Sequence, residues 1–331
     1  MMRKFSLSVI LGCVITFAYG QKWQILDPLP QVNNLNCIKF VDFNTGYAVG
    51  DNGTILKTIS SGELWVVMST SSSDNFNSIF TVNTNTWFIV GDSGRILRTT
   101  HGISGLTVQN SRTTNNLSSV YFCFAQGGTS LGCAVGDQGT ILTTMDGGQN
   151  WTSQSSGTTM WLHSVYFISV DTGFVVGDVG TILTTTNGGS NWTNLVSGTS
   201  YNLTSVNFTN SFIGYVVGDY GTIINTTDGG INWTEQNSGV TSLLRSVCFI
   251  SSNAGYAVGD YNTNTNSATI LRTSNGGTTW SSQNADALNV LNSVCFTNRS
   301  EGFAVGSNGV VLRSVNTGGQ SGKGGSHSHK L

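Results

Sequence analysis

A six-residue segment, Gly-Tyr-Ala-Val-Gly-Asp at residues 46–51, recurs six more times with small changes, and this repetition restricts the fold more than any other feature. Its second glycine falls at positions 50, 91, 136, 177, 218, 259 and 306. The spacings between these glycines are therefore 41, 45, 41, 41, 41 and 47 residues. One repeat length with occasional loop insertions predicts seven copies of a single structural unit, and the last spacing reflects an enlarged turn at Tyr261–Ala268.

Each unit is expected to form four short β-strands. In the fourth copy these are Ser164–Phe167, Phe174–Gly177, Thr181–Leu183 and a strand that begins at Trp192. The runs are rich in β-branched and aromatic residues, and Gly, Asn or Asp separates them as hairpins require. Only 9% of the residues are charged, which argues against a helical protein. Four-stranded units of about 40–45 residues are typical of propeller blades, so we predict an all-β, seven-bladed β-propeller.

The two ends of the chain are expected to close the ring. The seventh copy has three strands and then reaches Gly318-Gly319 without a Trp-containing strand. The missing strand matches the segment 22–26, Lys-Trp-Gln-Ile-Leu, near the other end of the chain. We therefore predict one propeller domain over residues 21–319, in which the first strand completes the last blade. Residues 320–331 are expected to be a flexible Gly/Ser/His tail.

The first 20 residues have the pattern of an export signal. A basic start, Met1–Lys4, precedes an apolar stretch from Phe5 to Phe17, and Ala18-Tyr19-Gly20 offers small residues for cleavage. The apolar stretch is shorter than the roughly 20 residues that a membrane span needs. We predict a signal peptide over residues 1–20, no transmembrane segment and a secreted protein, periplasmic or lumenal if the source is bacterial or photosynthetic. A lipoprotein signal ending at Cys13 is a minor alternative.

Between the third and fourth strands, four copies share the pattern Thr-x-Asx-Gly-Gly-x-x-Trp. Its Asx residues are Asp146, Asn187, Asp228 and Asn275, and its tryptophans are Trp151, Trp192, Trp233 and Trp280. The pattern resembles the Asp-box hairpin, also known as the BNR repeat, which implies a structural role for all eight residues. The full unit, Val-Gly-Asp-x-Gly-Thr-Ile-Leu followed by this box, resembles the photosystem II stability/assembly factor family from about Trp23 to Gly319. That resemblance implies a seven-bladed propeller that acts as a non-enzymatic assembly chaperone.

The sequence argues against catalysis, cofactors and metal. Sialidases also carry Asp-boxes, but no Arg-Ile-Pro motif precedes the boxes here. Xyloglucanase-type glycosidases resemble the repeats too, but they pair two propellers, and glycoside hydrolysis needs two suitably spaced carboxylates. Most acids of this chain occupy repeated turn positions: Asp51, Asp92, Asp137, Asp178, Asp219 and Asp260, with Asp146 and Asp228 in boxes. A glycosidase with a hidden carboxylate pair is therefore only the third hypothesis.

Function in a ring of repeats is expected where the repeats differ, and one such position follows Thr-Ile-Leu in the third strand. Its basic residues are Lys57, Arg98, Arg272 and Arg313, in copies that become contiguous when the ring closes, and Arg95 adds to them. We call these five residues the basic stripe. The resemblance implies that such a face binds a protein partner; alternatively, long basic side chains only cover apolar strand edges. With 14 basic and 16 acidic residues, nucleic acid is not an expected partner, and we expect a monomer.

A second asymmetry concerns the loops opposite the boxes. They carry four aromatic residues, Trp161, Tyr201, Tyr220 and Tyr261. On a polar, Asn-rich face these rings could stack on sugars or anchor a protein. A carbohydrate-binding propeller is therefore the alternative to a protein-binding scaffold. Packing of each ring against a neighbouring loop is the structural explanation.

Five cysteines remain after the signal peptide, an odd number. Cys123 and Cys133 could pair across one hairpin, whereas Cys248 and Cys295 share a register in successive first strands, a poor geometry for a disulfide. We expect buried free thiols, with Cys37 as the fifth.

Overall fold

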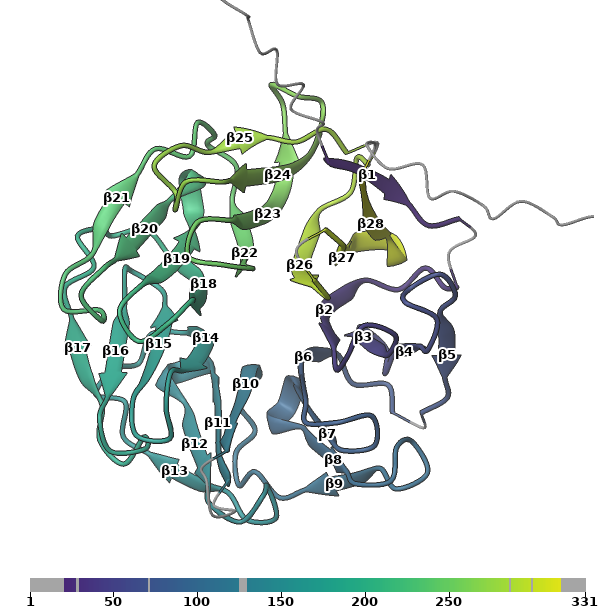
Figure 1. Ribbon diagram of the computed structural model, residues 1–331. Helices are drawn as coiled ribbons and strands as arrows, with labels where there is room; N and C mark the ends of the chain where they lie inside the picture. The colour runs from purple at the N-terminus through teal and green to yellow at the C-terminus, as the bar shows by residue number, and fades with distance from the viewer. Residues whose placement is uncertain are drawn as a thin grey trace, which may run out of the picture.

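A computed structural model of the chain describes residues 21–27, 30–70, 72–124, 130–285, 287–298 and 300–316. The predicted signal peptide and the predicted tail lie outside these residues. The described chain forms seven four-stranded antiparallel sheets arranged in a ring (Figure 1). The first strand of each blade lines the centre, and the fourth lies at the perimeter. The predicted seven-bladed propeller is confirmed.

The strands of each blade follow one another in the chain, except in the last blade. Blade one contains β2 (Leu35–Phe40), β3 (Gly46–Gly50), β4 (Ile55–Thr58) and β5 (Val66–Met68). Blade two contains β6 (Phe76–Thr81), β7 (Trp87–Gly91), β8 (Ile96–Thr99) and β9 (Thr107–Gln109). Blade three contains β10 (Leu117–Phe124), β11 (Ser130–Gly136), β12 (Ile141–Thr144) and β13 (Thr152–Gln154). Blade four contains β14 (Leu162–Phe167), β15 (Gly173–Gly177), β16 (Ile182–Thr185) and β17 (Thr193–Leu195). Blade five contains β18 (Leu203–Phe208), β19 (Gly214–Gly218), β20 (Ile223–Thr226) and β21 (Thr234–Gln236). Blade six contains β22 (Leu244–Phe249), β23 (Gly255–Asn262), β24 (Ser267–Thr273) and β25 (Ser281–Ser282). Blade seven contains β26 (Leu291–Phe296), β27 (Gly302–Gly306), β28 (Val311–Asn316) and β1 (Gln21–Ile25).

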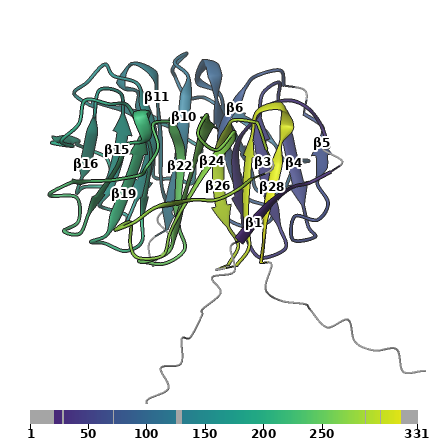
Figure 2. The ribbon, with the colours of Figure 1, turned by 90° about the horizontal axis from the view of Figure 1, so that it is seen from above.

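The first strand of the chain closes the ring, as predicted. Strand β1 pairs antiparallel with β28, with Trp23 opposite Ser314 (Figures 1 and 2). The Trp23 side chain is fully buried and lies edge-on to Tyr256 of blade six and Phe296 of blade seven, with ring centroids 6.0 Å apart in both cases. The closing strand therefore completes blade seven and also joins it to blade six.

Apolar side chains fill each interface between blades. Phe174 of blade four, for example, stacks on Phe208 of blade five at 4.6 Å and meets Trp233 of the same blade. At the inner edge, serine hydroxyls link successive first strands, because Ser164 Oγ accepts the Val206 N–H at 3.3 Å and its counterparts do the same. Neighbouring blades are thus held together by a buried core and by hydrogen bonds around the centre.

The turns explain the repeated glycines. In the Gly-Asp-x-Gly turn of blade five, Tyr220 and Gly221 both have left-handed backbones, with φ of +53° and +70°. The preceding Gly218 is extended, but a Cβ there would lie 2.0 Å from the Asn202 carbonyl oxygen. Gly221 is therefore required by its left-handed conformation, and Gly218 is required because the Asn202 backbone approaches it closely.

Two predicted details differ from the structure. The fourth strand begins one residue after its tryptophan, as in β13, which starts at Thr152. The predicted enlarged turn of blade six is largely an extended hairpin, because Tyr261 pairs with Ala268 and Asn262 with Ser267. The residues that the structure describes include short 3-10 turns but no α-helix, hence no helix able to cross a membrane.

Candidate functional site

The propeller has two faces that differ in their connections. The second-to-third-strand turns and the loops between blades form one face, which we call the loop face. The Asx-Gly-Gly turns and the first-to-second-strand turns form the opposite face, which we call the turn face. The aromatic residues were predicted on the loop face, whereas the basic stripe was predicted only as a position on the third strands.

The Asx side chains organise the turn face. Asp146 Oδ1 accepts hydrogen bonds from the Gln149 and Asn150 N–H groups at 2.9 and 3.0 Å and from the Thr144 hydroxyl at 2.8 Å. Asp228 holds its turn in the same way, and Asn187 and Asn275 do so through their amide oxygens.

The hydrogen bonds at these two aspartates also set their acidity. Partial burial acts to raise the pKa of Asp146, but the hydrogen bonds outweigh it and lower the pKa to about 2. Hydrogen bonds from Asn232 and Thr226 likewise lower the pKa of Asp228 to about 2. Both turns therefore carry a carboxylate at neutral pH.

The four tryptophans lie beside their own blades' first strands. Trp151 is buried and meets Phe122 edge-on at 6.0 Å, and Trp192 meets Phe167 in the same way at 6.1 Å. Trp233 and Trp280 repeat this contact with Phe208 and Phe249. These tryptophans pack in the blades rather than lining a binding surface.

Four residues of the basic stripe occupy equivalent positions on third strands. Lys57, Arg98, Arg272 and Arg313 stand across from the buried rings of Tyr47, Phe88, Tyr256 and Phe303 on second strands. Lys57 Nζ lies 5.6 Å from the centroid of the Tyr47 ring, and Arg313 Cζ lies 5.9 Å from that of Phe303. All four are half-buried, so their stems cover apolar surface while their charged ends reach the turn face.

The four basic side chains differ in whether a carboxylate pairs with them. Arg313 Nε donates to Glu301 Oε1 at 2.8 Å, and the Glu301 side chain is itself buried. Arg98 Nε donates to the Gly147 carbonyl of the next blade at 2.8 Å, which neutralises no charge. Among the described residues, Lys57, Arg98 and Arg272 form no ion pair. Three cations on blades six, one and two therefore lack a carboxylate.

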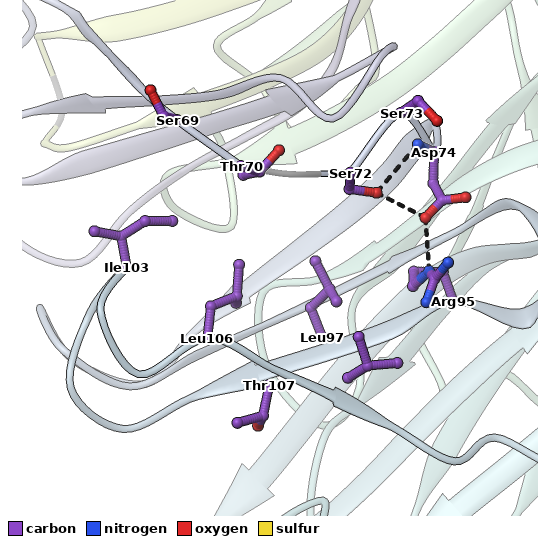
Figure 3. A pocket seen from close by; sticks show the side chains of 11 residues that line it. Ser69, Thr70, Ser72, Ser73, Asp74, Arg95, Leu97, Ile103, Leu106 and Thr107 are labelled. Carbon is purple, nitrogen blue, oxygen red and sulfur yellow. Dashed lines mark hydrogen bonds and ion pairs between the residues drawn. The ribbon is translucent and has the colours of Figure 1, made fainter.

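Arg95 lies apart from the other four. It precedes β8, at the end of that strand on the loop face, and its Nε lies 2.7 Å from Asp74 Oδ2. The pair borders a pocket of about 440 Å³ between blades one and two, where Ser69, Thr70 and Ser72 face Leu97 and Leu106 (Figure 3). Arg95 is thus paired, and it belongs to a different surface from Lys57 and Arg98.

Blades three to five lack the basic side chains. Their equivalent residues are Thr143, Thr184 and Asn225. Next to Thr143 a hollow of about 600 Å³ opens between blades three and four, and it is lined by Asp146, Asp171 and several amide side chains. This third-strand position is therefore basic in blades six, seven, one and two, and uncharged in blades three to five, where two carboxylates line the neighbouring hollow.

The predicted aromatic residues are exposed on the loop face but do not form one cluster. Tyr201 and Tyr220 lie together, with ring centroids 4.8 Å apart, and Tyr220 is 68% exposed. Trp161 instead lies against His163 at 5.1 Å and donates from Nε1 to Ser118 Oγ at 2.7 Å. Tyr261 hydrogen-bonds Asn266 of its own hairpin. The structure brings together one pair out of the four.

Sequence reasoning missed the central lumen. The first strands enclose a lumen of about 360 Å³ whose lining includes Lys39, Tyr121, Tyr166 and Arg245. The available signal was the variable residue of the Ser-Val-x-Phe repeat, which is Lys only in blade one. Within the described ranges, no group of three or more His, Cys, Asp or Glu residues is arranged to hold a metal ion.

Comparisons with known proteins agree with this architecture. Residues 106–201 match the family model described as photosynthesis system II assembly factor YCF48. The fold is similar to that of YCF48 bound to D1 peptide, at TM-score 0.71 and 21% identity over 88% of this chain and 96% of that one. YCF48 from Cyanidioschyzon merolae gives the same TM-score and identity over 89% and 99%.

A more distant similarity involves glycosidases. The GH74 xyloglucanase from Xanthomonas campestris matches at TM-score 0.71 and 11% identity, over 91% of this chain but only 54% of the enzyme. No curated protein sequence matches the chain significantly. The predicted resemblance to the photosystem II assembly factor family is confirmed over residues 106–201, and the fold that the chain shares with YCF48 is a seven-bladed β-propeller.

Proposed function

We propose that this propeller is an exported, non-enzymatic scaffold that binds a protein partner on the turn face, across blades six, seven, one and two. The observation that carries the proposal is the set of three cations without a carboxylate, Lys57, Arg98 and Arg272. They occupy equivalent positions on the third strands of blades six, one and two. These blades lie on the same side of the ring because β1 joins blade seven to the rest of the chain. Such a surface suits an acidic segment of a partner, since complementary charge speeds encounter and fixes orientation.

Two further observations support a binding role. YCF48, which shares the fold, has been seen bound to a D1 peptide, so a propeller of this form can hold a peptide. The acids of this chain mostly serve the fold: Asp146 and Asp228 hold turns, Asp74 pairs with Arg95, and Glu301 pairs with Arg313. A carboxylate that already accepts hydrogen bonds from backbone N–H groups or forms an ion pair with arginine is poorly placed for acid–base catalysis.

The test compares the wild-type domain with a triple variant, Lys57→Met, Arg98→Met and Arg272→Met. Methionine keeps an apolar stem over the strand and removes the charge. Both proteins would be immobilised and exposed to secreted and membrane extracts at about 50 mM and about 500 mM salt, since salt screens exposed charges. We expect a protein that the wild type retains at low salt, that high salt releases and that the triple variant binds at least about tenfold more weakly.

Arg112→Met is the matched control, because Arg112 is an exposed arginine outside the stripe. It should retain the same protein as the wild type. Arg313 is left intact because its loss would strand the buried Glu301 carboxylate. Equal retention by the wild type and the triple variant would rule out the stripe as the binding surface.

A carbohydrate-binding function is the alternative, and the exposed Tyr201–Tyr220 pair favours it. Adjacent rings on a polar face can stack on a sugar. In the same extracts, polysaccharide that survives the high-salt wash and is lost with Tyr220→Ala, but kept with Tyr261→Ala, would support this function instead. Turnover of a glycan with an acid–base pH profile would support the glycosidase hypothesis.

A further inference from the structure

The lumen contains a ring of side chains that neither face uses. It is formed by the variable residue of Ser-Val-x-Phe in each blade, and we call it the girdle. Its members are Lys39, Phe80, Tyr121, Tyr166, Asn207, Cys248 and Cys295. Most of them line the same lumen of about 360 Å³, a volume within the range of small-molecule sites.

Lys39 is the one charged member of the girdle. Its side chain is open to the lumen but surrounded by the ring, with Cys37, Cys295, Cys248 and Tyr166 nearby. The other basic groups of the lumen are paired, since His163 Nε2 lies 2.7 Å from Asp178 and Arg245 lies 2.5 Å from Asp260. In the described chain, Lys39 has no carboxylate partner.

Lys39 carries its charge at neutral pH. Enclosure acts to lower its pKa, Coulombic interactions with the Cys37, Cys295, Cys248 and Tyr166 side chains act to raise it, and the net direction is upward from 10.5. An ammonium held inside a ring of protein acts through a lower effective dielectric than one on the outer surface. An anion in the lumen would therefore be attracted more strongly than at an exposed lysine.

One side of the girdle is aromatic. Phe80 and Tyr121 have ring centroids 5.2 Å apart, and Tyr121 and Tyr166 4.9 Å apart. Tyr166 donates its hydroxyl hydrogen to the Phe208 carbonyl at 3.0 Å, so its ring rather than its proton is offered to a ligand. On the far side, Asn207 Oδ1 accepts the Phe249 N–H at 3.0 Å, which leaves its amide N–H groups as donors.

We propose that the lumen binds a small monocarboxylate with an apolar body. The carboxylate would pair with the Lys39 ammonium, and the body would pack on the rings of Phe80, Tyr121 and Tyr166. One positive charge matches one carboxylate. A phosphate dianion fits less well, because phosphate sites are usually built from several backbone N–H groups or arginines.

The test uses benzoate and its neutral analogue benzamide as probes in isothermal titration calorimetry. We expect the wild-type domain to bind benzoate and to bind benzamide about 10- to 100-fold more weakly, the effect of losing one charge-assisted hydrogen bond. Lys39→Met should weaken benzoate by a similar factor. Arg112→Met is the control. Arg112 is an exposed arginine outside both the lumen and the basic stripe, so this variant should bind benzoate like the wild type.

The proposal has clear points of failure. It is overturned if benzoate and benzamide bind the wild type equally, if Lys39→Met binds benzoate unchanged, or if no heat is seen up to about 10 mM benzoate. Inorganic phosphate that binds more tightly than benzoate, and depends on Lys39, would overturn the assignment to a monocarboxylate. Lys39→Gln replaces Lys39→Met if circular dichroism shows that the methionine variant is unfolded.

Discussion

Trp87 stands directly across from Thr81 on neighbouring strands of blade two, and this pair inverts the arrangement of the other six blades. There the first-strand residue is phenylalanine and the second-strand residue is glycine, as in Phe40 and Gly46. A Cβ at Gly46 would lie 2.8 Å from the Phe40 ring, so the phenylalanine excludes any side chain opposite. Threonine at position 81 makes room for an indole at position 87.

The exchange extends to a third position. Leu106 occupies the place in blade two where each other blade has tryptophan, such as Trp65 in blade one. Trp87 is fully buried and packs 5.6 Å from the Tyr47 ring of blade one. Blade two therefore supplies its indole to the interface from the second strand instead of the turn before the fourth.

We predict that Trp87→Ala lowers the free energy of unfolding by about 3–5 kcal/mol, the usual cost of removing a buried aromatic side chain. The triple variant Thr81→Phe, Trp87→Gly, Leu106→Trp should recover most of this loss, because it installs the pattern of the other six blades. Urea unfolding followed by tryptophan fluorescence measures both. A triple variant no more stable than Trp87→Gly alone would show that the three positions do not compensate one another.

Stability should depend on pH through Asp146 and Asp228. Their pKa values of about 2 lie below the ordinary 3.8, so each carboxylate stabilises the folded form above pH 4 and loses this effect as pH falls towards 2. The double variant Asp146→Asn, Asp228→Asn adopts the side chain found naturally at Asn187 and Asn275. Its melting temperature should fall less steeply between pH 4 and pH 2, and parallel profiles would contradict this.

Val179 has a left-handed backbone with φ of +55°, which a β-branched residue rarely adopts. The equivalent residues Asn52 and Asn308 have nearly the same φ, and asparagine tolerates it well. Because Val179 is 60% exposed, little packing is lost on substitution. We expect Val179→Asn to raise the free energy of unfolding by about 1 kcal/mol. Val179→Ala, which lacks the amide that lets asparagine hydrogen-bond locally in this conformation, should gain less.

All five cysteines of the described chain are free thiols. Cys133 and Cys295 are buried, and burial raises the pKa of both, so they should resist alkylation in the folded protein. Cys123 is less enclosed and should react first. Mass spectrometry after iodoacetamide treatment should show slow labelling at Cys123 under native conditions and five labels after unfolding. A disulfide between Cys123 and Cys133 would contradict this expectation.

The blades and the closure of the ring could be predicted because each sequence repeat forms the same four strands with the same contacts between them. The pairing of Trp23 with the last blade followed from a missing strand at one end and a spare strand at the other. Local turn chemistry, such as glycine after Tyr220, is also written directly in the sequence.

The sequence does not show which basic residues of the stripe form ion pairs. Arg313 looks like Lys57 in the sequence, yet it pairs with Glu301, which reaches it from a different turn of the same blade. The lumen was missed because each first strand has a bulge, as between Leu203 and Ser205. A bulge breaks the simple alternation of inward and outward side chains, so strand periodicity does not reveal that Lys39 faces the lumen.

The pairing of β1 with β28 has a consequence for how the protein is made. The partner of β1 lies almost 300 residues further along the chain, from Gln21 to Asn316. During synthesis, β1 with Trp23 is translated early. It remains unpaired until β28, near the other end of the chain, has been translated. The first six blades can assemble from neighbouring segments as they appear, but the ring gains its last blade only at the end. A helper that shields the waiting strand would therefore act on this protein before it can act on any partner.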